Sequence, residues 1–295
     1  MSFREKAVEF AGDPDILREN KRAFFNKTFY LCLGIGAILC IWLLCIQTAE
    51  AREVDRLIRE YGIEKAGLYY PRSLYNSFIG LDYAYLPSTI LYTIFPLLVT
   101  LPHAISYYRD KKSGYIKNIL IKADKKDYYA AKYLSVFLSG FTVTLMILFF
   151  SLWISAMFFP ALMPEVTTGI YCPFDSSAML AGLFYTHPLI YTLSYIFIDA
   201  VFFGATAAIA LGISCYADNI LFVFTGGMIL YLIVDYIMML TGRTEFSPLQ
   251  FLKPTQFLCN AKPAIILAEF LLLIGLVAIS FLRKERKKRC ILSMT

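Results

Sequence analysis

Few side chains in this sequence could carry out catalysis or hold a metal. Of the two histidines, His103 falls near one end of an apolar stretch and His187 near the opposite end of another. Stretches of that kind cross the hydrocarbon core of a bilayer, so the two imidazoles are expected on opposite sides and cannot share a metal. The seven cysteines show no metal-ligand spacing. The sequence therefore predicts no metal site and no catalytic residues, and we expect the chain not to be an enzyme.

A nucleotide-binding motif is also missing. Gly62 and Gly67 have the separation of P-loop glycines, but Leu68 follows where the motif needs lysine. We therefore expect no cofactor on this chain. If ATP drives the protein, another chain must bind it.

Asp199 is the most unusual acidic residue, because it lies near the middle of an apolar stretch. An unpaired carboxylate is costly at that depth in a membrane. Its side chain is expected to face the helix bundle, a wet cavity or a partner, or else to be protonated. Two interpretations stay open, a contact with substrate or gate and a structural hydrogen bond. Asp235 and Glu269 lie closer to the ends of their stretches, where a side chain can reach the interface.

The composition places these residues in a helical membrane protein. The chain of 295 residues is 58% hydrophobic and 17% charged. Six apolar runs are long enough to cross a membrane, at about 20 residues each. They cover residues 28–48, 86–106, 133–159, 188–216, 220–241 and 264–282. None alternates with a period of two, so a β-barrel is excluded and we predict an all-α polytopic protein with six spans.

Lysine and arginine set the predicted orientation. With both termini inside, the inner segments hold 20 of these residues and the outer segments hold 8. This is a clear positive-inside signal, and it puts the basic tail 283–295 in the cytosol. The net charge of +6 therefore reflects topology and contact with anionic lipids. No basic segment has the interleaved aromatics of a nucleic-acid platform, so no nucleic-acid partner is expected.

The segment between the second and third spans, residues 107–132, is a basic block. Eight of its 26 residues are Lys or Arg. Ser113 can cap a short helix, and Asp124 with Asp127 resembles a capping pair for a second helix that runs through Lys132 into the third span. The block is thus predicted as helix, turn, helix at the inner membrane surface. The alternative is a solvated basic loop.

The remaining segments give further predictions. Residues 1–27 suit an amphipathic helix at the inner interface. The first helix can continue outward to Tyr61, with Gly62 as its C-cap, and the tyrosine-rich remainder of that outer segment is expected at the headgroup level. Residues 242–263 are expected to form short helices that re-enter the outer interface. Cys172 and Cys259 both fall in outer segments, where they could form a disulfide or stay reduced.

Small residues recur on one face of the fourth span. Gly204, Ala208 and Gly212 are spaced four apart, which favours close approach of another helix. Whether that helix belongs to the same chain is left open by the sequence.

Taken in order, these elements resemble the membrane subunit of type-two ABC exporters. That family has an interfacial N-terminal helix, six spans with both ends inside, and a basic coupling element between the second and third spans. Within the element it typically shows an acidic residue, a glycine, hydrophobic residues and then a lysine that enters the third span. The corresponding residues here are Asp110, Gly114, Ile119, Leu120 and Lys132. Gly114 is followed by Tyr115, where the family often has threonine.

The resemblance implies a subunit that pairs with a second copy or a paralogue, with two cytosolic ABC ATPase subunits below that bind ATP and Mg²⁺. The helix from Gly114 to Lys122, with Lys117 on it, would ride in a groove of the ATPase and transmit its motion. A substrate cavity would be lined by the second and fifth spans. The polar candidates for its lining are Thr89, Thr93, Thr100, Thr225 and Tyr231, with Asp199 in the fourth span.

Two other functions are alternatives to this one. A membrane sensor or assembly factor would share the topology without an ATPase. A membrane-embedded lipid-modifying enzyme would need clustered His, Glu or Asp, in which the chain is poor. For an exporter in the cell membrane of a bacterium, the expected substrate is a hydrophobic or amphipathic molecule such as a peptide, a drug-like compound or a lipid.

Overall fold

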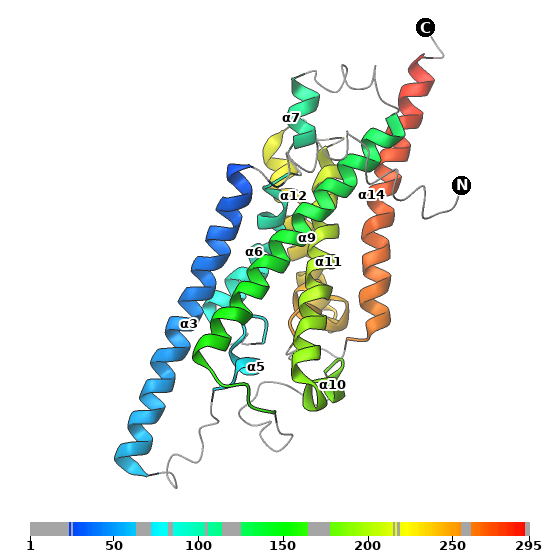
Figure 1. Ribbon diagram of the computed structural model, residues 1–295. Coiled ribbons are helices and arrows are strands. Elements are labelled where there is room, and N and C mark those ends of the chain that lie inside the picture. The colour runs from blue at the N-terminus through cyan, green and yellow to red at the C-terminus, as the bar shows by residue number, and fades with distance from the viewer. Residues whose placement is uncertain are drawn as a thin grey trace, which may run out of the picture.

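The chain forms an all-helical bundle in the computed structural model (Figure 1). The structure describes residues 24, 26–62, 72–81, 85–103, 106–113, 125–164, 178–214, 216, 219–254 and 261–292. The long helices are α3 (Lys27–Tyr61), α6 (Leu86–Thr100), α9 (Lys125–Phe158), α11 (Pro188–Ser214), α12 (Ile220–Leu240) and α14 (Pro263–Leu292). The short ones are α5 (Leu74–Ser77), α7 (Ser106–Lys112), α10 (Ala181–Thr186), the 3₁₀ helix η2 (Thr244–Phe246) and α13 (Pro248–Phe251).

Among the residues that the structure describes, four helices are long and apolar enough to cross a membrane. They are α3, residues Ala130–Phe158 of α9, α11 and α12. The second and sixth predicted spans coincide with shorter apolar helices, Leu86–Thr100 and Pro263–Val277. The architecture therefore fits a multi-pass membrane protein, and the full count of six spans stays a prediction.

The predicted second span, residues 86–106, is longer than the helix that forms. Helix α6 ends at Thr100, a turn covers Leu101 to His103, and α7 starts afresh at Ser106. Pro102 explains the break, because it has no N–H to continue the helix. Its free carbonyl accepts a hydrogen bond from the Asn26 side chain at 2.7 Å, which ties the turn to the start of α3.

Helix α11 occupies the centre of the bundle. It packs against α9, α14, α12 and α6. A helix surrounded in this way is expected to be apolar around most of its circumference, and α11 is, apart from Asp199 and a few hydroxyl-bearing residues. The start of α3, α7, the start of α9 and the end of α14 lie together at one end of the bundle, whereas α5 and α10 lie at the other (Figure 1). We call these the α7 end and the α5 end.

Small residues allow a close crossing between α9 and α11. A Cβ on Gly204 would lie 3.0 Å from the Phe137 carbonyl oxygen, and one on Gly140 would lie 2.9 Å from the Ala207 Cβ. The face of small residues predicted on the fourth span therefore packs against another helix. At Gly204 that helix is α9 of the same chain. Ala208 and Gly212 are also buried. Gly140 on α9 is a partner that the sequence analysis missed.

The segment after α3 inserts into the α5 end. As predicted, α3 continues to Tyr61 and is capped by Gly62, at a φ of 80°. Tyr75, in the tyrosine-rich segment expected at the headgroup level, is buried, as are Phe78 and Ile79. The Ile79 N–H donates to the Ser151 hydroxyl on α9 at 3.2 Å, and the Ser88 hydroxyl donates to the Ile79 carbonyl at 2.9 Å. Hydroxyls on α9 and α6 therefore satisfy this buried backbone.

The segment 244–254 also folds back on the bundle. Phe251 and Leu252 are fully buried, and the Tyr191 hydroxyl donates to the Pro254 carbonyl at 3.0 Å. The predicted short helices are therefore present as η2 and α13. Their depth in a membrane is part of the topology that stays a prediction.

Candidate functional site

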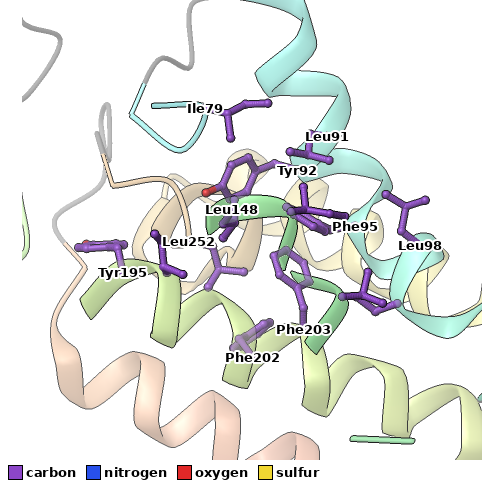
Figure 2. Close-up of a cluster of buried hydrophobic side chains, with 14 of the residues drawn as sticks. Ile79, Leu91, Tyr92, Phe95, Leu98, Leu148, Tyr195, Phe202, Phe203 and Leu252 are labelled. Atoms are coloured by element: carbon purple, nitrogen blue, oxygen red, sulfur yellow. The ribbon is translucent and has the colours of Figure 1, made fainter. Parts of the chain in front are cut away.

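Aromatic rings of α6 and α11 meet in the buried core of the bundle (Figure 2). Tyr92 and Phe95 of α6 meet edge to face with ring centroids 5.6 Å apart, and Phe95 lies 4.6 Å from Phe203 of α11. Phe203 in turn lies 6.2 Å from Tyr231 of α12. Because the surroundings are mostly apolar, a polar atom buried there is costly unless it is hydrogen-bonded.

Asp199 sits within this aromatic cluster and is 1% exposed. Its Oδ2 accepts a hydrogen bond from the Tyr92 hydroxyl at 2.8 Å, whereas its Oδ1 has no hydrogen-bond partner among the described residues. The Tyr231 hydroxyl is likewise buried and without a partner there. The structure thus places Asp199 toward the bundle, and Tyr92 gives it the structural hydrogen bond of the second interpretation. One carboxylate oxygen and one hydroxyl remain available for a further partner.

Asp235 lies near the α5 end, and its role there is structural. Its Oδ1 accepts hydrogen bonds from the Ser247 hydroxyl at 2.5 Å and from the Gln250 side-chain amide at 3.3 Å. Burial lowers the pKa of the nearby Lys253 ammonium, and the charge of Asp235 opposes that shift. Asp235 is therefore a buried anchor for η2 and α13, and its position relative to the membrane interface stays a prediction.

An ion pair between Asp110 and Lys132 lies at the α7 end. The Lys132 ammonium is 2.9 Å from the Asp110 Oδ2, and the two side chains are 0% and 5% exposed. Asp110 comes from α7 and Lys132 from the second turn of α9, so the pair joins the residues on either side of segment 114–124. The sequence analysis named both residues as parts of the coupling element but did not foresee that they meet.

Several predicted site residues lie outside the described residues. They are Gly114, Lys117, Ile119, Leu120, Lys122, Cys172 and Cys259. The predicted helix at residues 1–27 also lies outside, apart from Phe24, Asn26 and Lys27. The predicted coupling helix and disulfide therefore stay predictions.

The threonines proposed to line a cavity are mostly engaged with their own helices. The hydroxyls of Thr93, Thr100 and Thr225 donate to the carbonyls of Thr89, Leu97 and Leu221 at 2.7–2.8 Å. Thr100 is buried where α6 meets α12, with its hydroxyl 3.4 Å from the Phe224 carbonyl. Thr89 is exposed, and Thr93 and Thr225 are half-buried. The second and fifth predicted spans do pack side by side, but Tyr231 and Asp199 lie toward the bundle centre and not with these threonines.

A groove of about 820 Å³ lies between α11, α12 and α14. Apolar side chains make up most of its lining, among them Phe202 and Ile209 of α11, Leu230 of α12 and Leu276 of α14. Its polar members include Tyr231, Arg243 and Glu269. Sequence reasoning had no signal for this groove, because it depends on how far α12 and α14 stand apart.

Among the described residues, no three His, Cys, Asp or Glu side chains gather at one point. His103 follows the end of α6 and His187 directly precedes α11, and these two helices run in the same direction (Figure 1). The two histidines therefore lie at opposite ends of the bundle, and their placement on opposite sides of a membrane stays a prediction.

No protein-family model, no curated protein and no solved structure matches this chain. What the structure contributes to function is therefore the geometry of the Asp110–Lys132 pair, the central aromatic cluster and the groove.

Proposed function

We propose that this chain is the membrane subunit of an ATP-driven exporter in the cell membrane. In this proposal it has six spans with both termini in the cytosol, and the α7 end faces the cytosol. A separate ABC ATPase subunit binds ATP and Mg²⁺, and the chain works with a second copy or a paralogue. The substrate is a hydrophobic or amphipathic molecule. Its binding site is open first to one side of the membrane and then to the other.

The buried Asp110–Lys132 pair is the observation that carries the proposal. An element pushed by a cytosolic motor must be joined rigidly to the helices that it moves. The pair fixes both flanks of segment 114–124 to each other, and Lys132 places this junction on α9, which packs along α11. A basic loop that only sets the membrane orientation would not need a buried ion pair, because removing the two charges from water is costly.

The packing of α6 against α12 supports the same proposal. Their outer face carries exposed apolar residues, including Leu221, Phe222 and Ile229. Thr89 and Thr93 are the accessible polar residues of α6. A second subunit facing this surface would enclose a cavity between the two chains, lined by the second and fifth spans.

Co-purification tests the proposal. The full chain, tagged at its C-terminus, is purified from native membranes in mild detergent with ATP analogue, and bound proteins are identified by mass spectrometry and ATPase activity. In the test variant, residues 114–122 are replaced by a Gly/Ser block. In the matched control, a block of equal length replaces residues 165–173, which lie between α9 and α10 in the sequence.

We expect an ATPase subunit with a P-loop to co-purify with the native chain and the control, and to be lost with the 114–122 replacement. If no ATPase is recovered with the native chain in several mild detergents, the proposal is wrong. If the ATPase is recovered equally well with both replacements, the coupling role of segment 114–122 is wrong.

A further inference from the structure

The groove between α11, α12 and α14 opens at the side of the bundle. Its lining residues Leu230, Leu272 and Leu276 are each 41–58% exposed, so the opening faces the surroundings of the helices and not the bundle core. In a membrane those surroundings are acyl chains. A molecule could therefore enter the groove from the lipid, and its volume suits a small ligand.

Glu269 gives this apolar groove an acidic group. It lies six residues into α14, within the apolar part of that helix, and it lines the groove while half-buried. It has no ion-pair or hydrogen-bond partner among the described residues. Arg243 also lines the groove, but it follows the end of α12 and is exposed, so water can solvate its charge. A carboxylate at membrane depth without a partner favours a cationic ligand.

Tyr231 gives the groove a second polar group. It is 3% exposed and lines the groove from α12, and its hydroxyl has no partner among the described residues. A buried hydroxyl without a hydrogen bond is costly, so it too indicates a ligand that can donate or accept one.

We propose that this groove binds a lipophilic amine, with the ammonium group at Glu269 and Tyr231 and the apolar body along Phe202, Ile209 and Leu276. Charge complementarity argues for this occupant over a neutral acyl chain or a helix of a second copy, because neither would pair with Glu269. The inference that lipophilic amines are the exported substrate class rests on the proposed function. The binding of an amine to the groove does not.

Direct binding to the purified full chain tests the inference. The probe is dansylcadaverine, a fluorescent amphiphile with a primary amine, followed by anisotropy in a neutral detergent. The matched neutral probe is its N-acetyl derivative, which keeps the same body without the charge. The variants are Glu269→Gln and Tyr231→Phe, with Glu245→Gln on η2 as a control that removes a carboxylate outside the groove.

We expect the native chain and Glu245→Gln to bind the amine alike, and to bind the acetylated probe at least about tenfold more weakly. Glu269→Gln should weaken amine binding by about tenfold or more, and Tyr231→Phe by roughly threefold to tenfold. Leu276→Trp, which fills the groove without touching its charges, should also reduce binding, and it decides the test if Glu269→Gln does not fold.

Equal binding of the two probes would overturn the inference and indicate that lipid or a second copy occupies the groove. Unchanged binding in folded Glu269→Gln would overturn it as well. Amine binding without a co-purifying ATPase would refute the exporter and leave the groove assignment intact. Recovery of the ATPase without amine binding would refute the groove assignment and leave the exporter proposal intact.

Discussion

Removing one member of the Asp110–Lys132 pair is expected to destabilise the protein strongly. In Asp110→Leu the Lys132 ammonium, which is fully buried, loses its carboxylate partner, and in Lys132→Met the Asp110 carboxylate loses its ammonium. A buried charge without its partner costs about 3–5 kcal/mol. Each single variant should lower the free energy of unfolding by that order.

The double variant Asp110→Leu/Lys132→Met separates charge from packing. It removes both charges and keeps apolar side chains in their place, which is often neutral for stability. We therefore expect it to be more stable than either single variant, which requires a coupling energy larger than one single loss, above about 3–5 kcal/mol. The chain offers a matched exposed pair, Glu53–Arg56 of α3, whose side chains are 51% and 69% exposed. Its removal should cost about 0–1 kcal/mol.

The assay is an SDS titration of the purified full chain in mixed micelles, followed by far-UV circular dichroism. Two results would refute the reasoning. One is single variants at the α7 end that behave like those of the exposed pair. The other is a double variant whose loss equals the sum of the two single losses. Either would show that the charges are solvated in the protein and that the pair does not anchor segment 114–124.

Three further predictions concern packing and buried polar atoms, and the same titration measures each. Gly204→Ala should destabilise the bundle by about 1–3 kcal/mol, because the new Cβ would meet the Phe137 carbonyl and ring, whereas Gly275→Ala, with nothing within 4 Å, should be neutral or stabilising. Ser247→Ala should lower the free energy of unfolding by about 1–3 kcal/mol, because it removes the shorter hydrogen bond to Asp235. Hydrogen exchange should rise first in residues 244–254, and unchanged exchange there would contradict the anchoring role. Tyr92→Phe should cost a similar amount because it leaves the Asp199 carboxyl without its hydrogen bond, and Asp199→Asn, which can still accept that bond, should cost less; the reverse order would show that the charge of Asp199 stabilises the fold.

The helices could be predicted from the sequence because hydrophobic length and charge mark them directly. The predicted spans 188–216 and 220–241 differ from α11 and α12 by at most two residues at either end. The early end of α6 also had a signal, Pro102, which hydropathy alone does not register. Asp110 and Lys132 were selected through a family resemblance, but nothing in their spacing shows that α7 turns back to meet α9.

The insertion of residues 73–81 and the groove could not be predicted, because both depend on distant partners. Ile79 is buried because hydroxyls at Ser151 and Ser88 satisfy its backbone, and one of these partners lies 72 residues away. The groove exists because α12 and α14 both pack on α11 but stand apart from each other. No local pattern encodes that separation.

The position of α11 connects the two ends of the proposed mechanism. Lys132 belongs to α9, and α9 touches α11 through Gly140 and Gly204, where neither backbone can shift toward the other. The opposite side of α11 supplies Phe202 and Ile209 to the groove. In the proposed mechanism, a displacement of α9 at the α7 end would move α11 with it, because the glycine contacts leave no space between the two backbones. Helices α12 and α14 both pack on α11 and border the groove. A motor acting at segment 114–124 would in this way change the width of the groove without touching it.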